Sequence, residues 1–177
     1  MFTKPDIFKG ELFLAFPKGN TGCKDTSTLD WFVENYEQKI LCQIIGQLYY
    51  ELKQKFEDEE IVDGEKWDIL LNGGEYSVGD CKYTWKGLKY LIACFLFFYM
   101  SRDNEIETTT NGGKVVGYEV GKNVSLQTKA INNWNNATRL IKPRRCKGHA
   151  KCGTLLHFLE NSDFENYSVN FFEGGLI

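Results

Sequence analysis

The sequence lacks an uninterrupted apolar segment long enough to cross a membrane. Its longest apolar run, Leu88 to Met100, spans 13 residues and is broken only by Lys89. A membrane-spanning helix needs about 20 apolar residues, whereas a helix of this length reaches only about 20 Å. Polar residues at 101–104 close the run. We therefore expect a helix that is apolar on all sides and surrounded by protein, and no membrane partner.

The start of the chain lacks the apolar core of a secretion signal, because Asp6, Lys9 and Glu11 interrupt it. Without such a signal, the six cysteines are expected to be free thiols in a reducing compartment. A secreted, disulfide-stabilised domain is therefore not expected.

Catalytic motifs are also scarce. Only two histidines occur, and no nucleophile-elbow or catalytic-cysteine motif accompanies them. The Gly-Lys pair at residues 121–122 does not complete a phosphate-binding loop, because Val116 and Asn123 occupy the required glycine and hydroxyl positions. Adjacent acids such as Glu59 and Glu60 are typical of a solvated turn. We therefore predict no catalytic site and no cofactor, and do not expect an enzyme.

What the sequence does contain is an uneven distribution of charge, although its net charge is only −3. Residues 51–80 contain ten acids and three lysines, whereas residues 120–159 contain eight Lys or Arg and no acid. If copies of the chain associate head to tail, the acidic block of one subunit would face the basic block of its neighbour. A contact of this kind generates a ring when its rotation closes.

The basic loop that begins at residue 142 has three interpretations. Cys146, His149 and Cys152 have the two-residue spacing of zinc ligands, and His157 follows further on. The usual Cys-x-x-Cys pair is absent, however, and the ligand count is marginal for a tetrahedral zinc site. We therefore predict no metal, with Cys146, His149 and Cys152 as the candidates if one binds. Alternatively, Arg144 and Arg145 meet nucleic-acid phosphates, although few aromatic residues are present for base stacking. The simplest interpretation is a solvated loop with unpaired cysteines.

Apolar periodicity predicts helices at residues 30–56, 64–71, 87–100, 125–142 and 154–160. Ser27 or Thr28 is expected to cap the first of them. A short hairpin or loop is expected at 75–85, and a second hairpin or mobile loop at 108–120, with a turn at Asn111-Gly112-Gly113.

These elements predict a mainly α fold: a bundle of three to four helices around the central apolar helix, with short β-hairpin excursions and extended terminal arms. The expected organisation is an N-terminal arm over 1–28 with a short strand at 11–16, a helical domain over 29–142, and a basic loop with a C-terminal arm over 143–177. One face of the last long helix is expected to bury Ala130, Trp134 and Ala137.

Five segments carry a family resemblance: Phe32–Tyr50, Trp67–Tyr76, Tyr83–Leu88, Thr108–Gly113 and Asn132–Asn135. Their order resembles the head–tail connector (neck adaptor) proteins of tailed bacteriophages. It is most similar to the ring proteins of Bacteroidales-infecting, crAss-like phages. The resemblance covers about residues 28–141 and does not account for the Cys/His basic loop.

The resemblance implies a non-enzymatic helical-bundle subunit of a virion ring, typically twelve-fold. Such a ring lies below the portal, joins it to the next neck or tail protein, and lets DNA pass through its lumen. The protein would then reside in the virion neck, and in the host cytoplasm before assembly. The alternative is a small nucleic-acid-binding protein that uses the basic Cys/His loop at 142–152.

On this interpretation the terminal arms, the acidic turn and the basic loop dock neighbouring proteins. The interface candidates are Phe8, Phe13 and Phe16 in the N-terminal arm, Glu59 and Glu60 in the acidic turn, Arg144 and Arg145 in the basic loop, and Tyr167, Phe171 and Phe172 in the C-terminal arm.

Overall fold

The computed structural model describes residues 2–8, 12, 26–104, 106–109, 112–115, 126–142, 152–165 and 167–171. The elements are η1 (Pro5–Ile7), α1 (Thr26–Ile45), α2 (Leu48–Glu57), α3 (Lys66–Asn72), β1 (Gly74–Val78), β2 (Cys81–Trp85), α4 (Leu88–Asn104), β3 (Ile106–Thr109), β4 (Gly112–Val115), α5 (Leu126–Ile141) and α6 (Leu155–Glu160). The fold is mainly α with two antiparallel hairpins, as the sequence predicts.

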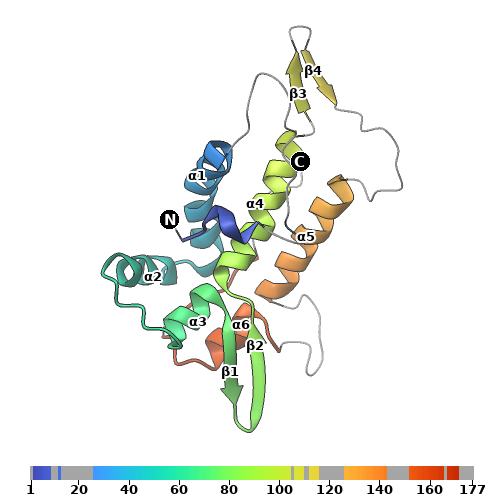
Figure 1. Cartoon of the computed structure of the whole chain (residues 1–177). Helices are drawn as coiled ribbons and strands as arrows, with labels where there is room; N and C mark the ends of the chain where they lie inside the picture. Colours follow the sequence, from blue (N-terminus) through green and yellow to red (C-terminus); the bar gives the residue numbers. More distant parts are fainter. Residues whose placement is uncertain are drawn as a thin grey trace.

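Helix α4 is the centre of the fold and lies between α1 and α5 (Figure 1). Every residue from 91 to 97 is 0% exposed, which confirms the predicted buried helix. The sequence predicts that the polar residues 101–104 close this helix. Instead the helix continues through Asn104, and Ser101 is fully buried. Within the described part of the chain, no helix is long and apolar enough to span a membrane.

Helix α5 covers α4 with the face that its periodicity predicts. Trp134 is 7% exposed, and its ring centroid lies 4.8 Å from those of both Phe95 and Phe98. Ala130 and Ala137 are buried on the same face, where small side chains let the two helices approach closely.

The single helix predicted over 30–56 is wrong at one point, because the chain breaks at Gly46 between α1 and α2. Gly46 has a φ of +54°, which glycine adopts without steric cost. An added Cβ there would lie 3.0 Å from Ser168 Oγ, so the C-terminal segment passes directly over the break. The apolar stripe does not reveal the break, because Leu48 and Leu52 remain buried beyond it.

The N-cap predicted at Ser27 or Thr28 is wrong, because both residues lie inside α1, which begins at Thr26.

Helix α3 ends where α4 begins, and two glycines allow the backbones to meet. Gly73 and Gly87 both have a φ of +88°. A Cβ added to Gly73 would lie 2.7 Å from the carbonyl carbon of Lys86, and one added to Gly87 would lie 2.6 Å from the nitrogen of Gly73. The buried indole of Trp85 also donates to the carbonyl of Leu70 at 3.0 Å. The β1–β2 hairpin is therefore held at its base by a close backbone contact.

The second hairpin, predicted within 108–120 as a hairpin or mobile loop, is present, but the predicted turn residues Gly112 and Gly113 lie in a strand. Strands β3 and β4 pair antiparallel, with Thr109 opposite Gly112 and Thr108 opposite Gly113. Both glycines therefore belong to the strand β4 and not to a turn.

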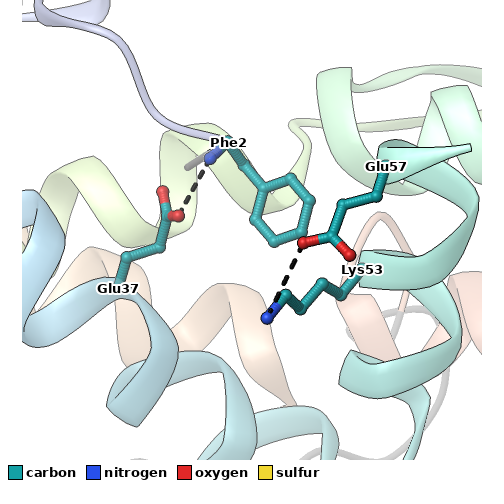
Figure 2. Close-up of polar contacts among 4 residues, drawn as sticks. All are labelled: Phe2, Glu37, Lys53 and Glu57. Atoms are coloured by element: carbon teal, nitrogen blue, oxygen red, sulfur yellow. Dashed lines mark hydrogen bonds and ion pairs between the residues drawn. The ribbon is translucent and has the colours of Figure 1, made fainter. Parts of the chain in front are cut away.

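Glu37 ties the start of the chain to the helical core. Its carboxylate is buried and accepts a hydrogen bond from the backbone N–H of Phe2 at 2.9 Å (Figure 2), and a second one from the backbone N–H of Thr3 at 2.7 Å. The Phe2 ring packs edge-on against Phe56, with centroids 4.8 Å apart. Phe2, Thr3 and Phe8 are therefore buried in the fold, where the sequence predicts an extended N-terminal arm. The predicted strand at 11–16 lies outside the described residues except for Leu12, which is buried.

We expect Glu37→Ala to lower the free energy of unfolding by about 1–3 kcal/mol, because two buried N–H groups lose their acceptor. Urea denaturation would measure the change. Glu34→Ala is the matched control, since Glu34 is exposed on the same helix. Equal stability losses in the two variants would show that the carboxylate of Glu37 does not hold the N-terminal segment.

Candidate functional site

The acidic block forms an exposed turn between α2 and α3, at one edge of the molecule in Figure 1. All of its acids from residue 57 to 65 are exposed: Glu57, Asp58, Glu59, Glu60, Asp63 and Glu65. Lys53 lies 3.7 Å from Glu57, and Lys55 lies 3.0 Å from Glu60. These exposed ion pairs neutralise part of the turn and add little stability.

Backbone hydrogen bonds give the acidic turn a defined shape. The N–H of Glu60 donates to the carbonyl of Lys55 at 2.9 Å, and Glu59 takes a positive φ of 55°. The Asp68 carboxylate accepts the N–H of Gly64 at 3.0 Å, and this bond is the main reason that the pKa of Asp68 is lowered. The turn is therefore closed at both ends.

Apolar side chains are also exposed at this edge. Tyr50 is 56% exposed, Val62 is 55% exposed and Phe56 is 37% exposed. Exposed aromatic and aliphatic groups that lie together are typical of protein contact surfaces, which carry polar and charged side chains at their rim.

A basic hollow forms a second surface feature, separate from the acidic turn. It has a volume of about 450 Å³ and is bordered by the end of the β1–β2 hairpin, the start of α4, the last turns of α5 and the segment before α6. Its lining residues are Lys86, Tyr90, Asn136, Arg139, Leu140, Cys152, Gly153 and Thr154. They include two cations and no carboxylate, so the hollow favours an anionic group.

Figure 1 places α5, which carries part of this hollow, at the edge opposite α2. Arg139 and Leu140 lie before the basic loop in the sequence, Cys152 lies at its end, and Lys86 and Tyr90 come from the end of the β1–β2 hairpin and the start of α4. The sequence predicts the basic loop but not the hollow. Lys86 and Arg139 are far apart in the sequence, and only the packing of α4 against α5 brings them together.

The hairpin face next to the hollow carries a polar cluster that sequence reasoning missed. The Tyr76 hydroxyl lies 2.5 Å from Nδ1 of His157 and accepts the N–H of Gly153 at 3.3 Å. Tyr83, opposite Tyr76 in the hairpin, packs edge-on against His157 with ring centroids 4.9 Å apart. The alternating pattern of the hairpin places both tyrosines on one face, but their partner in α6 is set by tertiary structure.

Of the predicted metal candidates, only Cys152 lies among the described residues. Its thiol and that of Cys81 form hydrogen bonds with the Tyr83 hydroxyl, and these contacts raise the pKa of Tyr83 to about 12. Where the structure describes the chain, no group of three or more His, Cys, Asp or Glu side chains could hold a metal ion. Cys146 and His149 lie outside that part.

Some of the predicted interface residues are exposed, one is buried, and others lie outside the described part of the chain. Glu59 and Glu60 are exposed in the acidic turn. The prediction for Phe8 is wrong, because its side chain is 8% exposed and belongs to the chain's own core. Phe13, Phe16, Arg144, Arg145 and Phe172 lie outside the described residues.

The C-terminal candidates Tyr167 and Phe171 are half-buried against their own chain. The N–H of Asn170 donates to the carbonyl of Ile44 at 2.9 Å, an acceptor near the end of α1. Lys142 donates to the carbonyl of Val169 at 3.0 Å, and its ammonium lies 4.6 Å from the centre of the Phe171 ring. This arm is thus fixed to the bundle over the part that the structure describes.

The tyrosines give a pH prediction. Burial is the main cause of the raised pKa of Tyr49, Tyr76, Tyr99 and Tyr167, whereas hydrogen bonds raise that of Tyr83. The folded protein therefore holds these protons more tightly than the unfolded chain. Their contribution to stability is complete below about pH 10 and is lost as the pH rises through the raised values.

We expect alkaline titration, followed by tyrosinate absorbance, to show a group of tyrosines that ionise late and together with unfolding. Tyr83→Phe should remove one late-ionising phenol. If Tyr83 ionises at its ordinary pKa near 10, the contacts with Cys81 and Cys152 do not form in solution.

Comparisons with known proteins do not identify a relative: no protein-family model, no curated protein and no solved structure matches the chain.

Proposed function

We propose that this protein is a non-enzymatic structural subunit of a tailed-bacteriophage neck, where copies form a ring. The ring joins the portal to the next neck or tail component and lets DNA pass through its lumen. The family resemblance supports this proposal, and one observation carries it: the acidic turn between α2 and α3 and the basic hollow bordered by α4, α5 and the segment before α6 are separate surfaces, and Figure 1 places α2 and α5 on opposite sides of α4.

This arrangement favours head-to-tail contacts over a two-fold dimer. In a two-fold dimer both subunits use the same surface, so the acidic turn meets the basic hollow only if a single interface contains both. In a head-to-tail contact the acidic edge of one subunit meets the basic edge of the next. Contacts of this type close into rings, the form that a connector needs around a DNA channel.

The test is assembly with the portal protein from the same genome. We expect electron microscopy to show a ring of this protein on the portal, and native mass spectrometry to give its copy number, expected to be twelve from the resemblance. A protein that remains monomeric and does not bind the portal would contradict the proposed function.

A second candidate function is binding of nucleic acid through residues 142–152, which the basic lining of the adjacent hollow favours. Fluorescence anisotropy with duplex DNA at increasing salt would measure this binding, which should weaken steeply if phosphates are the ligands. Arg144→Ala with Arg145→Ala should then reduce the affinity. Unchanged binding in this variant would exclude the loop as the DNA site.

A further inference from the structure

We propose that the basic hollow receives the acidic turn of a second copy of this chain. The inference rests on the proposed function and deepens it, because it names the surfaces through which neighbouring subunits meet. The hollow is the site, and residues 57–65 of the neighbour are its occupant.

The hollow is suited to carboxylates that enter between two cations. Lys86 comes from the end of the hairpin and Arg139 from the last turns of α5, so the two charges stand on separate elements. The Lys86 ammonium lies 4.9 Å from the centre of the Tyr90 ring, which restricts where it can move. Arginine can bind a carboxylate with two parallel hydrogen bonds, and Asn136 adds a polar group to the same wall.

The acidic turn is suited to enter such a hollow. Lys53 and Lys55 pair with Glu57 and Glu60, so the remaining charge of residues 57–65 comes from Asp58 and Glu59 between these pairs and from Asp63 and Glu65. The hydrogen bonds that close the turn already fix its backbone, which lowers the entropy lost on docking.

Apolar surface accompanies the charges on both sides. Val62 is 55% exposed in the turn, and Tyr90 and Leu140 contribute to the wall of the hollow. A phosphate backbone would use the two cations but makes less use of Tyr90 and Leu140. A protein turn uses both, so we assign the hollow to a second copy and treat DNA as the competing outcome.

The decisive variants reverse charge on one side of the contact at a time. Asp58→Lys with Glu59→Lys changes the turn, and Lys86→Glu with Arg139→Glu changes the hollow. Glu34→Lys and Lys39→Glu are matched controls, because both residues are exposed on α1. Circular dichroism and thermal unfolding would verify that all variants fold.

Self-association of the full chain would be followed by amide NMR shifts over a concentration series at low salt, which detects weak contacts. We expect wild-type shifts at both the turn and the hollow. Each double reversal should weaken self-association by about tenfold or more, and the controls should leave it unchanged. An equimolar mixture of the two double-reversal variants should associate again, because one retains the turn and the other retains the hollow.

Three results would overturn this inference. The wild type could show no concentration-dependent shifts, the reversals could leave association unchanged, or a short duplex DNA could shift the hollow residues while a second copy does not. In each case the ring proposal would still be judged separately by portal binding. If the reversals behave as expected but no ring forms on the portal, the contact is correct and the connector role is wrong.

Discussion

Trp134→Ala is expected to lower the free energy of unfolding by about 3–5 kcal/mol, the usual cost of truncating a buried aromatic side chain. The indole fills the space between α4 and α5 and lies 4.8 Å from the rings of both Phe95 and Phe98. Its loss would leave a cavity in the most heavily buried part of the molecule, where the helices cannot collapse without shifting the whole bundle. Chemical denaturation with a tertiary-structure probe would measure the change.

Ile131→Ala is the control on the same helix. Ile131 is 42% exposed, so the substitution should change stability by no more than about 0.5 kcal/mol. If Trp134→Ala and Ile131→Ala lower the free energy of unfolding by the same amount, α5 does not pack on α4 through its predicted face.

Gly87→Ala is expected to destabilise the fold by about 2–5 kcal/mol, for two reasons that act together. The φ of +88° strains any residue that carries a Cβ. The new methyl group would also lie 2.6 Å from the nitrogen of Gly73, which is backbone and cannot rotate away. The segments that lead into β1 and out of β2 would have to separate, and the packing of α4 with α3 would be lost.

Gly79→Ala separates strain from crowding. Gly79 has a φ of +57°, but a Cβ there has no atom within 4 Å, so only the conformational cost of about 1–2 kcal/mol should remain. The difference between the two variants measures the close backbone contact at the base of the hairpin. Equal losses would indicate that this contact does not form in solution.

The sequence predicts most of the helices because their apolar residues recur with helical period. The faces of α4 and α5 follow directly, since no polar residue interrupts residues 90–100 and Trp134 lies one turn from Ala130. The break at Gly46 could not be predicted in this way. The stripe of apolar residues continues through it, and the decisive neighbour, Ser168, comes from the other end of the chain.

Of the candidate site, the sequence predicts the acidic turn but not the basic hollow. The acidic turn is visible in the sequence because its carboxylates are consecutive and no apolar residue separates residues 57–60. The hollow is not visible, because Lys86 and Arg139 are ordinary surface cations until α4 and α5 pack together. The prediction for Phe8 failed for a related reason: sequence reasoning had no means to place the buried acceptor Glu37, whose bonds to Phe2 and Thr3 hold the N-terminal segment in the core.

By itself, the sequence determines the buried central helix, the amphipathic helices around it and the separation of acidic from basic residues along the chain. These features depend on spacing between near neighbours, which hydrophobic burial and local charge fix. Tertiary structure alone decides that α2 and α5 lie on opposite sides of α4, that a hollow opens beside Lys86 and Arg139, and that Phe2, Thr3 and Phe8 are buried in the core. Those outcomes depend on contacts between residues far apart in the chain, which no local pattern encodes.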